Sequence, residues 1–562
     1  MNEQLADLSR RYWDTALAAS PLSAGILGDH RFDDQVEDLS REREDELIAA
    51  FDGFVAEAEV IDPAELDLED RLTRETLIVE VSGQADSLRS RSAEFAVDPM
   101  IGIHMDLVSF VPQLSPNDRE QADAYVTKAS KVGGMFDQAI ERLRQGIANG
   151  RTPVRTLAEK SLGQLDAYLA APVEQDPFLQ IQPPPTMDEA AMRAWREAMT
   201  VQVEAVVRPA VARYREVVAD EVLPAARSDD EAGVMHLPDG GEVYERAVRR
   251  FTSLELDPVA VHQSGLEDIA GLEDDYRELG ERVLGTHDLE EIYARLRDDP
   301  ALRFDTSAEV LAQAERAMAR ANEATPDWFG RRPQAPCVVR EIPAVGAADA
   351  PLAYYLPPTT DGSRPGMFFV NTTEPGTRTR YESEALAFHE GVPGHHFQIA
   401  LGQEIEGVPE FRRHALSTAF VEGWGLYTER LADEMGLYSG DLERLGILSF
   451  DSWRAGRLVV DTGIHVLGWS RAQAIDYLAA NSPQARNNIV NEVDRYIGWP
   501  GQALAYKIGQ REIFRYRGAA ERTLGDDFDI KGFHDAVLGH GSLPLPALGV
   551  VVEDWVAAVQ AP

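Results

Sequence analysis

The segment AFHEGVPGHHFQ contains three of the chain's twelve histidines and one glutamate. Its His389–Glu390 pair has the form of the H-E-x-x-H helix of zinc hydrolases. There, two histidines one turn apart hold the ion and the glutamate takes a proton from water. The position of the second histidine is Pro393 here, however. His395 and His396 would lie about 9–10 Å further along an unbroken helix, too far to share one ion with His389.

A break in the helix would remove this difficulty. Pro393 cannot donate a hydrogen bond to the carbonyl of His389, and its ring clashes with that turn. Flanking glycines lower the cost of an irregular backbone. We therefore expect one helix to end near Gly391 and another to begin with Pro393 in its first turn. Such a bend could return His395 or His396 to the metal. The residues of this segment alone do not decide between these two histidines, and they are also compatible with a polar turn that binds no metal.

A third ligand is expected from the next helix, within STAFVEGWGLYTERLADEMG. Glu422 lies in a largely apolar stretch, where a carboxylate is costly to bury unless it is paired or bound to metal. We predict Glu422 as the third zinc ligand, against the alternative of an exposed helical glutamate. Glu429 follows seven positions later on nearly the same face, and is a weaker candidate for a residue that orients a ligand. Its alternative is a surface pair with Arg430.

Two C-terminal segments, RLVVDTGIHVLGWS and RYIGWPGQALAYKIGQ, supply candidate substrate contacts. A zinc peptidase needs a donor opposite the metal to stabilise the oxyanion, and we predict His465 and Tyr506 for this role. Lys507 or Arg495 could hold a substrate carboxylate, which would favour a carboxypeptidase or dipeptidase. The alternative for each is helix packing with a hydrogen-bonded polar tip.

The elements around these motifs are mostly helical, since apolar residues recur at intervals of three and four. Near residue 333, the runs APCVVREIPA, APLAYYLPP and RPGMFFVNT predict short strands. We therefore expect a mainly α fold, large and metallopeptidase-like, with a small β-sheet beside the active-site helices. Residues 1–332 would wall a cleft and residues 333–562 would form the catalytic region of one continuous two-lobed unit. An exposed strand edge could bind an extended peptide.

Composition excludes several classes of protein. The net charge of −42 argues against nucleic-acid binding, which needs basic surfaces. The lone Cys337 cannot form an internal disulfide or a cysteine-based zinc site. No stretch of about 18 uncharged apolar residues and no signal-peptide pattern occurs. We expect an acidic cytoplasmic protein without membrane segments, and the sequence does not indicate its oligomeric state.

Four segments, HEGVPGHHFQ, FVEGWGLYTERL, DTGIHVLGW and RYIGWPGQALAYKIGQ, resemble the DUF885 family of gluzincin-like metallopeptidases. The resemblance spans most of the chain, and its specific motifs lie in residues 365–545. The family motif H-E-x-x-P-G-H falls on residues 389–395. It implies His389 and His395 as zinc ligands and Glu390 as the general base, with Glu422 on the following helix.

The resulting hypothesis is a hydrolase with one Zn²⁺ that cleaves peptide bonds in short peptides, with Glu390 as general base. The resemblance favours His395 as the second ligand, and His396 remains an alternative. Two other functions remain open: a metal-dependent amidase acting on a non-peptide amide, and an inactive binding or scaffold protein with the same fold. The sequence does not identify the substrate, the native metal, or whether cleavage is internal or terminal.

Overall fold

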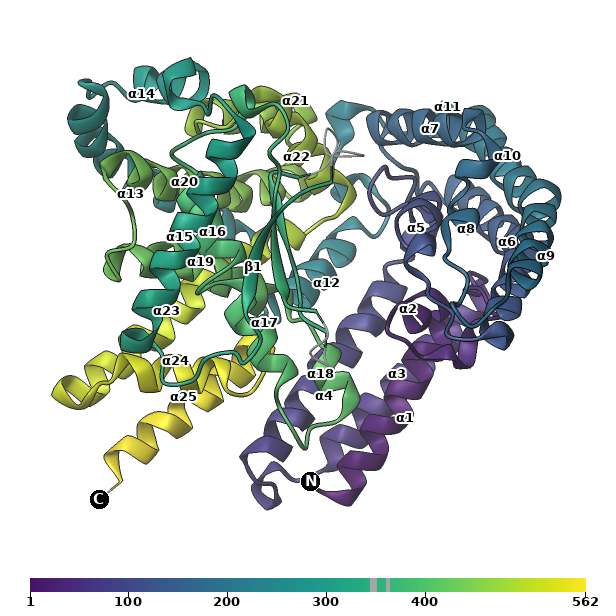
Figure 1. Cartoon of the computed structure of the whole chain (residues 1–562), viewed down its shortest axis with the longest axis horizontal. Coiled ribbons are helices and arrows are strands. Elements are labelled where there is room, and N and C mark those ends of the chain that lie inside the picture. Colours follow the sequence, from purple (N-terminus) through teal and green to yellow (C-terminus); the bar gives the residue numbers. More distant parts are fainter. Residues whose placement is uncertain (344–350, 360–363, 562) are drawn as a thin grey trace.

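The computed structural model describes residues 1–343, 351–359 and 364–561, and these form a mainly α-helical protein with one small sheet, as predicted. Most of α1 to α11 gather on one side of the molecule, and most of α13 to α25 gather on the other (Figure 1). The first group comprises α1 Glu3–Ala19, α2 Pro21–Ile26, α3 Arg41–Val60, α4 Leu68–Arg89, α5 Ile103–Ser109, α6 Arg119–Ala148, α7 Arg155–Ala170, α8 Pro177–Gln180, α9 Glu189–Gln202, α10 Arg208–Val217 and α11 Leu223–Ala225.

The second group begins after α12, which lies between the two sides (Figure 1). Helix α12 comprises Gly240–Thr252. The helices that follow it are α13 Pro258–Leu284, α14 Leu289–Asp298, α15 Ser307–Trp328, α16 Ser383–Glu390, α17 His395–Gln403, α18 Glu410–His414, α19 Thr418–Glu434, α20 Asp441–His465, α21 Arg471–Asn481, α22 Arg486–Gly498, α23 Ala505–Leu524, α24 Ile530–Leu538 and α25 Leu545–Gln560.

The small sheet has three strands in the order β1-β3-β2, where β1 is Cys337–Glu341, β2 is Ala353–Leu356 and β3 is Gly366–Val370. Strands β1 and β3 are parallel, and β2 is antiparallel to β3. Phe368 and Val370 alternate along β3 toward the core, as expected for a strand with one buried face. The sheet therefore packs beside α15 and α16 and forms a wall next to the histidine-bearing helices.

The largest hydrophobic core runs from Val234 to Val552 and crosses the boundary predicted at residue 332. The most extensive helix–helix contact of the described chain is between α13 and α20. Gly265 allows these helices to approach closely, because a Cβ there would lie 2.8 Å from the Cβ of Leu458. A separate core fills the N-terminal side, around α6, α9 and α10. Helix α20 is thus fixed along its length by burial, which matters for the side chains it presents.

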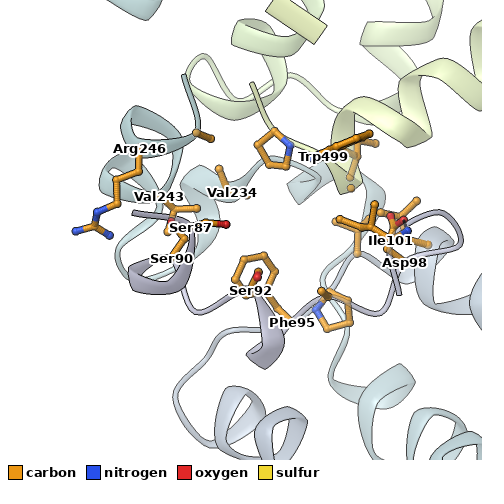
Figure 2. A pocket seen from close by; sticks show the side chains of 18 of the residues that line it. Ser87, Ser90, Ser92, Phe95, Asp98, Ile101, Val234, Val243, Arg246 and Trp499 are labelled. Carbon is orange, nitrogen blue, oxygen red and sulfur yellow. Dashed lines mark hydrogen bonds between the residues drawn. The ribbon is translucent and has the colours of Figure 1, made fainter. Parts of the chain in front are cut away.

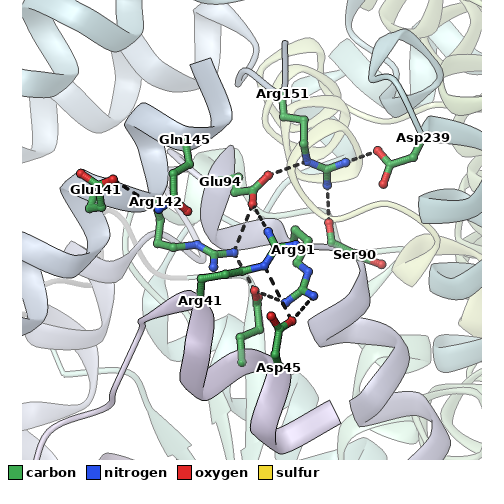
Figure 3. Close-up of polar contacts among 11 residues, drawn as sticks. Arg41, Asp45, Ser90, Arg91, Glu94, Glu141, Arg142, Gln145, Arg151 and Asp239 are labelled. Carbon is green, nitrogen blue, oxygen red and sulfur yellow. Dashed lines mark hydrogen bonds and ion pairs between the residues drawn. The ribbon is translucent and has the colours of Figure 1, made fainter. Parts of the chain in front are cut away.

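A buried charge network joins the N-terminal helices to α12 (Figure 3). Glu94 is 2% exposed and forms ion pairs with three arginines. Arg41 on α3 lies 2.7 Å away, Arg151 lies 3.0 Å away, and Arg142 on α6 lies 3.4 Å away. Arg151 also pairs with Asp239, at the start of α12. One carboxylate therefore helps to connect three N-terminal segments to the helix between the two sides.

Glu94→Gln is expected to lower the free energy of unfolding by about 3–5 kcal/mol, because it removes the carboxylate that three guanidinium groups share in a buried place. The matched control is Glu141→Gln, an exposed glutamate on α6 that contacts Gln145. It should change stability by no more than about 0.5 kcal/mol. Urea unfolding followed by circular dichroism measures both, and equal effects would show that the network is not stabilising.

Candidate metal centre

The turn between α16 and α17 folds the chain back on itself. Helix α16 ends at Glu390, residues 391–394 form the turn, and α17 begins at His395. Pro393 therefore lies in the turn, not in the first turn of the second helix as predicted. Its carbonyl accepts a 3.0 Å hydrogen bond from the indole of Trp424 on α19. The predicted break in the helix is confirmed, and α19 holds it in place.

This reversal depends on a close backbone approach. A Cβ at Gly394 would lie 1.8 Å from the carbonyl oxygen of His389, so only glycine fits there. The result is that the imidazoles of His389 and His395 meet edge to face, with ring centres 4.6 Å apart. Two histidines six positions apart in sequence thus become neighbours.

His389, His395 and Glu422 form a group that could hold a metal ion, with ligand atoms all within 4.8 Å of one another. The Nε2 atoms of both histidines lie 3.7 Å from Oε2 of Glu422. Ligand atoms around a tetrahedral zinc ion are about 3.3 Å apart, given bonds of about 2.0–2.1 Å. The three side chains therefore fit one ion after small movements. No other such group of three occurs in the described part of the chain.

Glu429 contacts the first candidate ligand, His389, and lies on the same helix as Glu422. Its Oε1 lies 2.7 Å from Nδ1 of His389 and accepts the proton of that nitrogen. This leaves Nε2 on the side of Glu422, where it can carry a proton or bind a metal ion, as in the carboxylate–histidine pairs of zinc sites. Gly425 makes room for the ring, because a Cβ there would lie 2.7 Å from His389 Cε1. Of the two alternatives for Glu429, the structure shows the contact with His389, the weaker candidate, whereas Arg430 pairs with Asp451.

The charges of these groups match a cation site. Burial opposes protonation of His389, but hydrogen bonds to Glu422 and Glu429 raise its pKa to about 9. Burial also opposes ionisation of Glu422, yet the hydrogen bond to His389 and the nearby charges lower its pKa to about 2. Burial lowers the pKa of His395 to about 4, so that histidine is neutral. Positive charge is thus favoured between the carboxylates, where either a proton or a metal ion can supply it.

Glu390 follows the first ligand directly and is only partly covered. Burial raises its pKa to about 7, against the opposing charge of His389. A carboxylate with a pKa in this range can accept and release a proton near neutral pH, as a general base must. Its position and its pKa both fit the role that the sequence predicts.

His396 has no free nitrogen for a metal. Its Nε2 donates to the carbonyl of Ala335, 3.1 Å away, and its Nδ1 accepts from the hydroxyl of Tyr355 on β2, 2.9 Å away. Burial lowers its pKa to about 4. This histidine joins α17 to the sheet, and the geometry therefore selects His395 as the second ligand candidate.

The role predicted for His465 does not fit the structure. Its Nδ1 accepts from the backbone of Val234 and its Nε2 donates to the carbonyl of Tyr496, at 3.1 and 2.9 Å. Neither nitrogen remains to bind an oxyanion. Tyr506, by contrast, is partly exposed and lies near Glu422, which adds to the effect of burial in raising its pKa. The phenol therefore stays protonated and remains a candidate donor.

The two predicted carboxylate-binding residues already have carboxylate partners. Lys507 is buried and lies 2.8 Å from Asp451, which also pairs with Arg430. Arg495 lies 2.8 Å from Glu492. A substrate carboxylate would have to compete with these pairs, so the structure does not favour either assignment.

Two arginines on α20, Arg454 and Arg457, were missed by the sequence analysis. They lie 6.0 and 4.2 Å from the ring centre of Tyr506, and their charges act on Glu390 and Glu422 of the candidate metal centre, respectively. A sequence signal existed: both arginines share a helical face with Asp461 in the largely apolar stretch 445–465. Charged residues on a fully buried helix indicate either paired structural groups or a binding site.

An apolar pocket of about 210 Å³ lies elsewhere, between the N-terminal segments and the turn before α23. Figure 2 shows Phe95, Val243 and Trp499 around its opening. Asp461 holds this turn by accepting a hydrogen bond from the backbone of Gly501. None of the metal-centre side chains lines the pocket. The pocket is therefore distinct from the candidate site.

Metal-free protein should lose about 2–3 kcal/mol of stability between pH 7 and pH 10 because of His389. Its pKa is about 9 in the folded state and 6.5 without perturbation, so the stabilisation is complete below pH 6.5 and disappears as the pH rises through 9. Urea unfolding in the presence of a chelator measures this loss. His389→Gln, which cannot titrate, should lose less. Identical losses in both proteins would contradict the assigned interaction.

The fold has close counterparts among solved structures. A crystal structure described as that of "the putative lipoprotein from Colwellia psychrerythraea" is 26% identical, with a TM-score of 0.90 and coverage of 99% of both chains. "A putative lipoprotein of unknown function from Shewanella oneidensis" is 18% identical, with a TM-score of 0.77 and coverage of 98% of this chain and 99% of that one, and it shows the fold alone. No curated protein matches. None of the described helices is long and apolar enough to cross a membrane.

One family profile covers almost the whole chain, including the histidine turn, the glutamate helix and the C-terminal segments. That family is described as "Bacterial protein of unknown function (DUF885)" and its profile matches residues 21–552. The chain therefore belongs to the DUF885 family.

Proposed function

We propose that this protein is a zinc-dependent hydrolase that cleaves peptide bonds in short peptides. His389, His395 and Glu422 hold one Zn²⁺, and Glu390 is the general base. The observation that carries the proposal is the convergence of three ligand atoms within 4.8 Å, with Glu429 bonded behind the first ligand. The relation to gluzincin-like peptidases through the H-E-x-x-P-G-H motif is part of the same proposal.

Zinc bound to these ligands would lower the pKa of a water molecule and polarise the scissile carbonyl. Glu390 takes the proton of the attacking water and delivers it to the leaving amine, for which its pKa of about 7 is suited. Tyr506 remains protonated and donates a hydrogen bond to the developing oxyanion. Glu429 keeps His389 in the orientation that binding requires.

Restricted access to the centre supports a small substrate. The side chain of His395 is 10% exposed and that of Glu422 is 21% exposed. A chain end or a short peptide can reach such groups, whereas a folded protein surface cannot. The sheet next to the site could hold an extended peptide along a free strand edge. We keep a cytoplasmic location as a prediction, since the lipoprotein descriptions apply to the structural relatives.

Adjacent histidines provide a matched test of the metal site. Wild-type protein is first dialysed against a solution of Zn²⁺ and then against buffer without zinc. We expect it to retain one zinc ion per chain. His395→Ala should lose stoichiometric zinc, because only two ligands remain. His396→Ala should keep zinc, although it loses two hydrogen bonds to the sheet region. Elemental analysis measures both, and retention of zinc by His395→Ala would reject the ligand assignment.

Glu390→Gln is expected to reduce kcat on short peptides by at least about 100-fold while zinc content stays at the wild-type level, because only the proton acceptor is removed. A library of short peptides analysed by mass spectrometry identifies the cleaved bonds. Cleavage of non-peptide amides alone would favour the amidase alternative. Stoichiometric zinc without any hydrolysis would favour a binding protein.

A further inference from the structure

Arg454 is a buried cation without an anionic partner. The residue is 6% exposed, and within the described residues it forms no hydrogen bond and no ion pair. Its guanidinium stacks on Phe450 and Trp453, at 4.4 and 4.5 Å from the ring centres. Nε and Nη1 are fully covered by these surroundings, which leaves Nη2 as the nitrogen open to an additional partner. A buried charge without a partner is costly in free energy unless a bound ligand supplies the opposite charge.

The neighbouring cations differ from Arg454 in this respect. Arg430 and Lys507 share Asp451, and Arg495 pairs with Glu492. Each of them therefore has a carboxylate within its own surroundings. These three cations lie on α19, α22 and α23, so the lack of a partner at Arg454 on α20 is not shared by the cations of the neighbouring helices.

Arg457 adds to the local excess of positive charge. It pairs with Glu492, at 2.9 Å, but so does Arg495, and the Nη1 of Arg457 is buried without a partner. Arg454, Arg457 and Arg495 thus have one carboxylate, Glu492, among their ion-pair partners in the described chain. The other carboxylates that the charges of Arg454 and Arg457 reach, Glu390 and Glu422, belong to the proposed reaction centre. Such a place attracts an anion.

The two arginines lie beside the proposed reaction centre. Arg457 stacks on Tyr506 at 4.2 Å from the ring centre, and Arg454 lies 6.0 Å from the same ring. The charge of Arg454 reaches both Glu390 and His395, and that of Arg457 reaches Glu422. An anion bound here therefore lies near Tyr506, the candidate oxyanion donor of the proposed reaction centre.

We propose that Arg454, assisted by Arg457, binds the C-terminal carboxylate of the peptide substrate, so that cleavage removes one or two residues from the C-terminal end. This inference rests on the proposed hydrolase function and specifies its substrate. A guanidinium is the group best suited to bind a carboxylate through charge-assisted hydrogen bonds. Every unmodified peptide carries that anion at a fixed distance from its last bonds, whereas an acidic side chain occurs only in some sequences.

The test compares N-acetylated tetrapeptide libraries that end in a free carboxylate with the same libraries ending in an amide. Zinc-loaded wild-type protein is expected to prefer the free carboxylate by about 10- to 100-fold in kcat/KM. Arg454→Gln should lose this preference, mainly through a higher KM for the peptides that end in a free carboxylate. A third library, amidated but with aspartate or glutamate at the last position, shows whether a side-chain carboxylate can substitute. If it restores the full rate, the terminal carboxylate is not the recognised group.

Two further variants separate charge from packing. Arg454→Lys keeps the charge without the planar group and should retain part of the preference. Arg511→Gln removes an arginine of α23 that pairs with Asp268 at the surface, and should leave the preference unchanged. Zinc content and circular dichroism check each variant. If Arg454→Gln does not fold, the comparison of libraries on wild type and Arg454→Lys still decides the question.

The outcomes distinguish this inference from the proposed function. Equal cleavage of acid and amide peptides by wild-type protein would overturn the carboxylate site and leave the hydrolase intact. Cleavage of neither library would reject the hydrolase, and calorimetry on the same protein would then test the site directly. Tighter binding of the free-carboxylate library, lost in Arg454→Gln, would support the site. Equal binding of both libraries would overturn it.

Discussion

The return of the chain at residues 391–394 is the constraint on which the candidate site depends. A regular helix would carry His395 away from His389. The turn brings it back, and the Trp424 indole holds the turn through the carbonyl of Pro393. Because Trp424 lies on the helix that also provides Glu422, one packing contact aligns all three candidate ligands. A residue that disrupts the familiar zinc-helix spacing is thus part of an alternative way to build the same set of ligands.

Helix α20 has a comparable role on the other side of the centre. It is fixed by close packing on α13 and by Asp461 and His465, whose side chains bond the backbone of distant segments. A helix restrained in this way can hold Arg454 in an apolar aromatic setting without a counter-ion. The stability of the core therefore offsets the free-energy cost of burying the Arg454 guanidinium, whose partner would be a ligand. This division explains why the same helix carries both anchoring residues and residues of the proposed substrate site.

Residue types and local spacing were sufficient to predict the helical fold, the three strands and the break in the helix after His389, and they proposed Glu422 as the partner that the structure places beside His389. These features arise from short-range periodicity, helix breakers and the chemistry of buried carboxylates. The structural role of His465 could not be predicted from local spacing, because its hydrogen-bond partner Val234 lies 231 positions earlier in the chain. Choosing between His395 and His396 required the position of the sheet, which occupies both nitrogens of His396. Finding Arg454 required knowing which cations lack partners, and this becomes visible only when the whole chain is folded.

The central claim, that this turn creates a metal site, is tested most directly by anomalous diffraction at the zinc absorption edge from crystals grown with Zn²⁺. The account predicts one strong peak bound by Nε2 of His389, Nε2 of His395 and the carboxylate of Glu422. It also predicts that Glu429 remains bonded to His389 behind the ion. A peak bound through His396, or an ordered turn without any peak among these three side chains, would contradict it.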